Sequence, residues 1–169
     1  MAPKNQFLWL TTDSVTRDIA APADRLYDLV SDLPRMGNWS NECRTVEWTG
    51  GATGPAVGAT FVGHNAIGPR GIIRWSRKGR VLTAEPGREF AFVTEEGGKE
   101  GVIWRYVFTP NGGTTRVTES YDVRWLPVRF RVADILTNRY GSIRKTMRHT
   151  LDKLKAAAEK PANVPGRSS

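Results

Sequence analysis

The sequence predicts an α+β fold in which a curved antiparallel sheet of seven strands wraps around one long C-terminal helix. From residue 44 to 123, polar and apolar side chains alternate in runs separated by Gly-rich turns, a pattern typical of hairpins in an antiparallel sheet. Residues 129–158 lack proline and repeat apolar side chains at helical spacing. A sheet and a helix that each have one apolar face bury both faces by packing together.

The first strand is predicted at residues 13–20, where polar and apolar side chains alternate. Pro22 suits the first turn of a helix that continues to Leu33, and Pro34 ends it. Residues 34–43 are too polar and Gly-rich for a long element, so a short helix or a loop carrying Trp39 is expected. Two short helices therefore separate the first strand from the second.

Six further strands are predicted by alternation, and glycine-rich turns separate them. The run 71–85 is long and contains glycine, so we expect a β-bulge there. The strands are residues 44–49, 59–65, 71–85, 88–95, 101–110 and 114–123.

The chain has 169 residues, of which 39% are hydrophobic, enough for one domain with a real core. We expect that domain at residues 13–158, after an extension at 1–12 and before a disordered tail at 159–169. No apolar run is long enough for a membrane helix. The apolar patch 7–10 lacks the features of a signal peptide, so a cytoplasmic location is expected.

Metal and cofactor chemistry find no support in the sequence. The one cysteine, Cys43, forms no intrachain disulfide, and we expect a small buried side chain rather than a nucleophile. His64 and His149 lie far apart, and no spacing suggests a zinc site. No phosphate-binding or dinucleotide-binding motif is present, so no cofactor is expected.

The formal net charge of +8 is concentrated near the C-terminus. Residues 1–123 hold 14 basic and 14 acidic residues, whereas residues 124–155 hold nine basic residues and two acidic ones. This basic helix face is either a solvated surface or a contact for anionic lipid headgroups. No nucleic-acid-binding motif is present, which argues against a nucleic-acid partner. Its main residues are Arg129, Arg131, Arg139, Arg144, Lys145 and Arg148.

The order of elements resembles the helix-grip fold of the START-like (SRPBCC) superfamily, in particular its polyketide cyclase/dehydrase and lipid transport branch. The resemblance extends over residues 13–155. Its main segments are VTRDIAAPADRLYDLVSDLPRMGNWS (15–40), GATFVGHN (58–65), RWSRKGRVLTAEPGREFAFVTE (74–95), WRYVFTPNGGTTRVTESYDV (104–123) and the closing helix. It implies a cavity between sheet and long helix, with an entrance at the loop after the first helices. Family members range from cyclases to lipid carriers, so the reaction is not implied.

Successive side chains of a strand point to opposite faces of the sheet, and we take the face that carries most aromatic side chains to face the cavity. The alternation then predicts which side chains line it. Trp39 is added as a candidate cap at the entrance or a packing residue, and Tyr140, Ile143 and Met147 as helix residues that face the sheet. His64 falls on the outward parity. The strand candidates are Phe61, Asn65, Trp75, Arg77, Phe90, Phe92, Trp104, Tyr106 and Glu119.

Asn65, Arg77 and Glu119 are the polar residues of the inward parity. Buried charges need partners, so an Arg77–Glu119 pair with the Asn65 amide is expected. Such a set is either a structural ion pair, an anchor for a polar ligand group, or, with Arg77 and Glu119 as candidate catalytic residues, acid–base machinery.

The leading hypothesis is a binding protein or carrier for a small hydrophobic or aromatic molecule of lipid or polyketide type. The first alternative is a polyketide cyclase/dehydratase that uses the same cavity. The second is a protein that contacts a membrane or nucleic-acid surface through the basic helix. The sequence decides neither between binding and catalysis nor the oligomeric state.

Overall fold

Seven antiparallel strands form one sheet in the computed structural model of the protein, which describes residues 12–127 and 139–160. The sheet order is β1-β7-β6-β5-β4-β3-β2, so β2 to β7 form a meander and β1 lies beside β7. The predicted seven-stranded antiparallel sheet is confirmed. The strands are β1 (Thr12–Ile19), β2 (Cys43–Thr49), β3 (Thr60–Ile67), β4 (Ile73–Glu85), β5 (Glu89–Glu96), β6 (Lys99–Asn111) and β7 (Thr114–Val123).

The two short helices predicted between β1 and β2 are confirmed, and a further short helix that was not predicted lies between β3 and β4. Helix α1 (Ala23–Ser31) and the 3₁₀ helix η2 (Leu33–Asn38) connect β1 to β2, and the 3₁₀ helix η3 (Pro69–Gly71) connects β3 to β4. The long C-terminal helix α3 (Arg139–Ala158) is confirmed. Its predicted start at 129–138, most of the predicted extension and most of the predicted tail lie outside the described residues. No helix within the described ranges is both long enough and apolar enough to span a bilayer.

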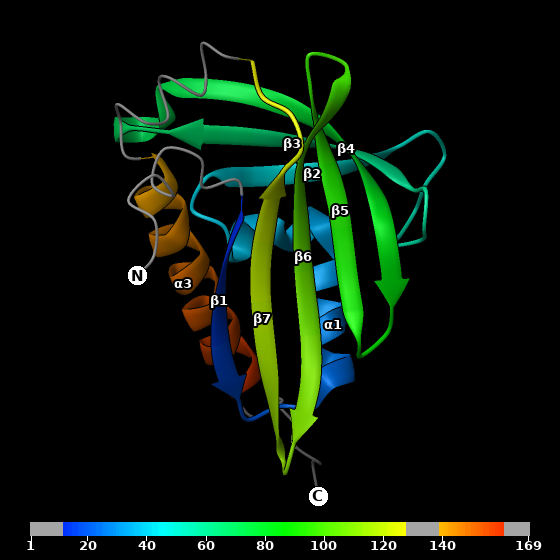
Figure 1. Ribbon diagram of the computed structural model, residues 1–169, viewed down its shortest axis with the longest axis vertical. Coiled ribbons are helices and arrows are strands. Elements are labelled where there is room, and N and C mark those ends of the chain that lie inside the picture. The colour runs from blue at the N-terminus through cyan, green and yellow to red at the C-terminus, as the bar shows by residue number, and fades with distance from the viewer. Residues whose placement is uncertain (1–11, 128–138, 161–169) are drawn as a thin grey trace, which may run out of the picture.

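The sheet is strongly curved, and the long helix packs beside its edge (Figure 1). Strands β2 and β3 run steeply across the ends of β6 and β7, and α3 lies along β1. The core between sheet and helices contains Leu26 of α1, Phe90 of β5, and Leu151 and Leu154 of α3, all at most 1% exposed. Burial of such side chains stabilises the fold by about 25 cal/mol per Å².

The two faces of the sheet alternate as the sequence predicts. On β7, Val117, Glu119 and Tyr121 are buried, whereas Arg116 lies on the outer face and pairs with Asp18. The pairing of β4 with β5 shifts between Val81 and Thr83, within the run where we expect a bulge.

Candidate functional site

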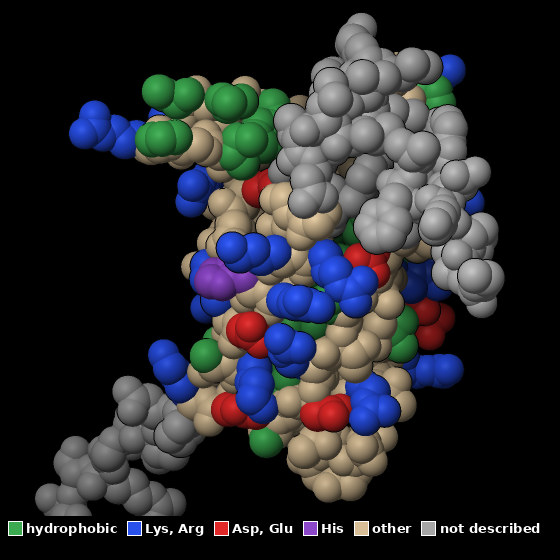
Figure 2. All heavy atoms as spheres, turned by 60° about the vertical axis from the view of Figure 1, so that its left-hand side comes forward, with side chains coloured by type: hydrophobic (Ala, Val, Ile, Leu, Met, Phe, Trp, Pro, Cys, Tyr) green, Lys and Arg blue, Asp and Glu red, His purple; other side chains and the backbone are tan. Residues whose placement is uncertain are grey.

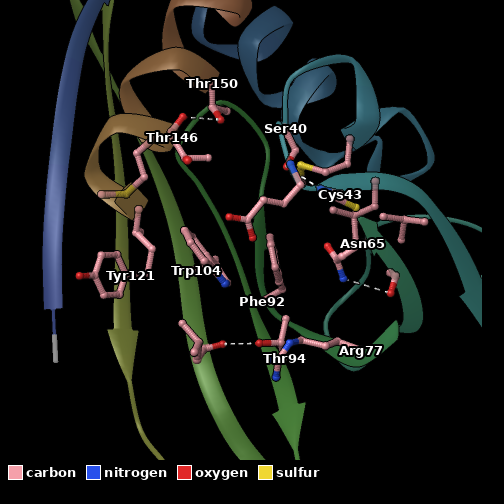
Figure 3. A pocket seen from close by; sticks show the side chains of 18 of the residues that line it. Ser40, Cys43, Asn65, Arg77, Phe92, Thr94, Trp104, Tyr121, Thr146 and Thr150 are labelled. Carbon is pink, nitrogen blue, oxygen red and sulfur yellow. Dashed lines mark hydrogen bonds between the residues drawn. The ribbon is translucent and has the colours of Figure 1, made fainter. Parts of the chain in front are cut away.

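A cavity of about 280 Å³ lies between the concave face of the sheet, α3 and the segment from η2 to β2. Its volume is close to the lower limit of the range of about 300–1,000 Å³ found for ligand pockets. Figure 3 shows side chains from β3, β5 and β6 facing the same space as Thr146 of α3. Most of the wall is apolar. Its apolar side chains include Leu33, Met36, Val46, Phe61, Trp75, Phe92, Val102, Trp104, Val123, Leu126, Ile143 and Met147.

Ten of the candidates named from the sequence line this one cavity. Eight of them come from the alternation of the strands and two from the helix, and their contact with a ligand stays a prediction. The ten are Phe61, Asn65, Trp75, Arg77, Phe92, Trp104, Tyr106, Glu119, Ile143 and Met147.

The other three candidates do not contribute to the described wall. Trp39 is 7% exposed, and its indole N–H donates a hydrogen bond of 3.2 Å to the carbonyl of Leu29, so it is a packing residue rather than a cap. Phe90 is fully buried against the edge of Tyr27, with ring centroids 6.1 Å apart, because it lies under α1. The side chain of Tyr140 lies outside the described part of the chain.

Glu119 is the buried acid of the cavity. It is 3% exposed, and the phenol of Tyr106 on the neighbouring strand donates a hydrogen bond of 2.9 Å to its Oε1. Its Oε2 is buried and has no hydrogen-bond partner among the described residues. Burial raises the pKa of Glu119 to about 8, against the opposing effect of the Tyr106 hydrogen bond. Glu119 is therefore mostly protonated and neutral at pH 7.

Tyr106 keeps its proton for related reasons. Burial and the neighbouring Glu119 raise the pKa of the phenol well above its usual value. The pair thus holds two protons at neutral pH, one on the phenol and one on the carboxyl group. Because Tyr106 donates to Oε1, the Glu119 proton is left for Oε2, which has no acceptor on the described protein.

The expected Arg77–Glu119 pair is wrong. Arg77 instead forms an ion pair with Glu96 of β5, and their side chains are 32% and 18% exposed. Gly79 pairs with Thr94 across β4 and β5, and two residues further along each strand the antiparallel ladder brings Arg77 and Glu96 together. The strand prediction ended at residue 95, one residue short of this partner.

The Asn65 side chain forms its hydrogen bond with the backbone and not with Glu96 or Glu119. Its Nδ2 donates a hydrogen bond of 3.4 Å to the carbonyl of Gly63 on its own strand. The three polar residues expected to form one cluster therefore have three different partners. They still share the cavity wall, where each offers a different polar group.

Several wall residues were missed as candidates because they lie outside the alternating runs or on polar positions of the helix. Ser40 accepts hydrogen bonds from the backbone N–H groups of Glu42 and Cys43 at the start of β2. Cys43 is partly buried rather than fully buried as expected, and burial raises the pKa of its thiol to about 11, which is the opposite of the lowered pKa of a nucleophilic thiol. Thr146 and Thr150 of α3 also line the cavity. They are four residues apart, which places both side chains on one face of the helix, so helical spacing could have indicated them.

The arrangement offers hydrogen bonding and proton transfer in an apolar space. A neutral carboxylic acid at a cavity wall donates a hydrogen bond to a carbonyl or hydroxyl oxygen, or supplies a proton to it. Within the described ranges, no group of three or more His, Cys, Asp and Glu side chains is arranged to hold a metal ion.

Comparison with known proteins gives a consistent result. The sequence model of the family described as polyketide cyclase/dehydrase and lipid transport matches residues 12–159. A search of curated proteins found no match. The solution structure of the polyketide-cyclase-like protein Cgl2372 from Corynebacterium glutamicum is similar, with 30% identity and a TM-score of 0.60 over 87% of this chain and 91% of that one.

More distant structures share the fold. Protein CV1439 from Chromobacterium violaceum is 17% identical, with a TM-score of 0.64 over 89% of this chain and 99% of that chain. The di-domain ARO/CYC protein StfQ of the steffimycin biosynthetic pathway is 13% identical, with a TM-score of 0.71 over 91% of this chain and 52% of StfQ. The chain thus spans about half the length of StfQ.

Proposed function

Because the chain belongs to the polyketide cyclase/dehydrase and lipid transport family, we propose that it binds a small hydrophobic or aromatic molecule in the cavity between the sheet and α3. The observation that carries this proposal is the cavity of about 280 Å³ with a mostly apolar wall and a buried neutral acid in that wall. Apolar pockets with a few directed polar groups are the usual form of small-molecule sites.

Residues of the cavity wall would contribute to binding in two ways, as apolar contact surface and as a polar anchor. Trp75, Phe92 and Trp104 supply flat apolar surface that suits an aromatic or polyene ligand. Glu119 is the polar anchor, since its proton is available to a neutral acceptor such as a ketone oxygen. A carboxylate ligand is disfavoured only at a pH above the pKa of Glu119, where the ionised side chain would repel it.

A cavity-filling variant tests this proposal. A Cβ added at Gly63, in the cavity wall, would have its nearest neighbouring atoms at 3.9 Å, so Gly63→Leu extends into the cavity without a clash at Cβ. Gly54→Leu is the matched control, because a Cβ there meets nothing within 4 Å and the residue is not part of the wall. Binding of a neutral, polarity-sensitive naphthalene fluorophore is the measurement.

We expect the natural protein and Gly54→Leu to bind the fluorophore equally and Gly63→Leu to bind it at least tenfold more weakly, a loss of about 1.4 kcal/mol. Equal binding by all three proteins would place the fluorophore outside the cavity and refute the proposal. Thermal unfolding of each variant checks that the fold is intact.

A cyclase/dehydratase is the second candidate function, and the raised pKa of the buried Glu119 favours it. Protonated Glu119 can give its proton to the hydroxyl of a β-hydroxy ketone, and the resulting carboxylate can take the proton from the α-carbon. The substrate then loses water, and Glu119 is regenerated. Absorbance of the conjugated product from a β-hydroxy ketone tests this. Turnover that persists in Glu119→Gln would exclude Glu119 as the acid.

A further inference from the structure

The tip of the β3–β4 hairpin exposes two adjacent isoleucines. Ile72 and Ile73 are 79% and 57% exposed, directly after η3. Among the described residues, only Val57 is a comparably exposed large hydrophobic residue, at 69%. Figure 2 shows hydrophobic side chains gathered at the projecting corner that this hairpin forms, with Lys and Arg side chains near them. Paired apolar side chains at a projecting tip are a feature of surfaces that meet a partner.

Three arginines surround this tip. Arg44, Arg70 and Arg74 line a shallow groove of about 680 Å³ at the base of the hairpin, and all three are exposed. Within residues 12–127 and 139–160, no carboxylate lies within ion-pair distance of any of them. Their positive charge is therefore available to an anionic partner.

The backbone of the turn is unusual at one of these arginines. Arg70 has φ 56° and ψ 20°, the left-handed region that few side chains adopt, and it is the one described non-glycine residue with positive φ. Gly68 and Gly71 also have positive φ, so three of the four residues of this tight turn have φ in the left-handed region. Strained backbone of this kind persists where the surroundings require it.

The basic face of α3 is less suited to an anionic surface. Arg144 pairs with Asp13 at 2.7 Å, and Lys155 pairs with Glu159 at 2.7 Å. On β1, Arg17 pairs with Asp152 of α3 at 2.8 Å. Within the described part of α3, no large hydrophobic side chain is exposed beside these charges. Lys145, Arg148 and Lys153 have no ion pair among the described residues, but positive charges without an apolar anchor beside them bind bilayers weakly.

We propose that the β3–β4 hairpin tip docks on an anionic phospholipid bilayer. Ile72 and Ile73 enter the interface between headgroups and acyl chains, and Arg44, Arg70 and Arg74 contact lipid phosphates. Charge complementarity favours this partner, because the tip combines apolar side chains with three arginines that have no ion pair among the described residues, and no acid lines the groove. Trp75 and Asn65 line both the groove and the ligand cavity, so docking brings the cavity wall next to the bilayer.

Sedimentation with vesicles tests the proposal, using phosphatidylcholine alone and phosphatidylcholine mixed with phosphatidylglycerol. We expect binding to the mixed vesicles only. The variant Arg44→Ser/Arg70→Ser/Arg74→Ser should bind roughly 100-fold more weakly, at about fivefold for each arginine. Ile72→Ser/Ile73→Ser keeps the charge and should bind about tenfold more weakly. All substituted residues are exposed, and thermal unfolding checks their fold.

The matched control is Lys145→Ser/Arg148→Ser/Lys153→Ser, which removes three positive charges from α3. It should lower binding by less than about threefold, since only long-range attraction is lost. An equal loss in this control and in the arginine variant would overturn the proposal in favour of non-specific attraction. The proposal would also be overturned if the protein did not bind vesicles but associated with itself through Ile72 and Ile73. That result would identify a second copy of the protein as the partner of the hairpin tip. Neither result bears on the cavity, whose fluorophore binding is measured without lipid.

Discussion

Tyr106 and Glu119 lie directly opposite each other on β6 and β7, and the phenol of Tyr106 donates a hydrogen bond of 2.9 Å to the Glu119 carboxyl group. The hydrogen bond satisfies one carboxyl oxygen and leaves the other, Oε2, without a partner among the described residues. A buried group with this geometry costs stability when it is charged and is inexpensive to keep when it is neutral. The pair therefore connects the protein's stability, its pH dependence and its ligand preference.

Glu119→Gln should make stability less dependent on pH. The folded-state pKa of about 8 lies above the ordinary value of 4.5, so between these values the folded protein holds a proton that the unfolded chain releases. The free energy of unfolding of the natural protein therefore falls as pH rises through this window, by up to about 1.4 kcal/mol per pH unit. Glutamine has no such proton.

Urea unfolding across this window, with both proteins at each pH, is the measurement. The two should be similar near pH 5, and the variant should be more stable by several kcal/mol near pH 8, in line with the linkage relation. Parallel pH profiles of the two proteins would show that Glu119 is ionised in the folded state at neutral pH.

Tyr106→Phe should cost more stability at high pH than at low pH. The phenol donates to a neutral acid at low pH and to a carboxylate at high pH, and hydrogen bonds contribute about 0.5–1.5 kcal/mol to neutral groups and about 1.5–3 kcal/mol to charged ones. The variant should also raise the pKa of Glu119 further, since the hydrogen bond opposes the effect of burial. A double-mutant cycle with Glu119→Leu, measured by urea unfolding, isolates the coupling, because leucine removes the acceptor that glutamine would keep. Zero coupling at every pH would mean that the hydrogen bond does not form.

Gly79→Ala should destabilise the protein by about 1–3 kcal/mol through overpacking. A Cβ at this position would lie 2.7 Å from Cε2 of Phe61 and closer still to its Cζ. Phe61 has little room to move, because its ring packs edge-on against Phe92 and Trp48.

Gly63→Ala is the control for this change, since the atoms nearest to its added Cβ are 3.9 Å away. Its free energy of unfolding should stay within about 0.5 kcal/mol of the natural protein or rise slightly. If both alanine variants unfold at the same denaturant concentration, the register of β3 against β4 is not the one described.

Arg77 should couple to Glu96 and not to Glu119. Because the Arg77–Glu96 pair is partly exposed, the coupling energy from a double alanine cycle should be about 0.5–1 kcal/mol. The same cycle between Arg77 and Glu119 should give less than about 0.3 kcal/mol. A reversed order of the two coupling energies, from urea unfolding at neutral pH, would restore the pairing expected from the sequence.

Most of the fold could be predicted from the sequence, because strands, turns and helix ends each have a local sequence pattern. Alternation and glycine turns define β2 to β7, and Pro22 and Pro34 bracket α1. The inward parity also selected the cavity wall, since every second side chain of a strand shares a face. Family resemblance supplied the arrangement of helix and sheet.

Contacts between particular side chains on different strands or loops could not be predicted from local sequence patterns. The choice of Glu96 over Glu119 as partner of Arg77 depends on which strands are neighbours and on their register, which one-residue errors at strand ends obscure. Trp39 was ambiguous because a loop tryptophan either packs or caps, and the hydrogen bond to Leu29 that decides it is a tertiary contact. The charge state of Glu119 follows from its burial.

Native mass spectrometry of the gently purified protein, beside the denatured mass of the same sample, shows whether the cavity holds a ligand. We expect an additional mass that persists in the folded protein and is released on unfolding. This mass should be retained in Gly54→Leu and lost in Gly63→Leu. A bare protein that also fails to retain the naphthalene fluorophore, or an additional mass that survives in Gly63→Leu, would contradict the claim that this cavity holds a small hydrophobic ligand.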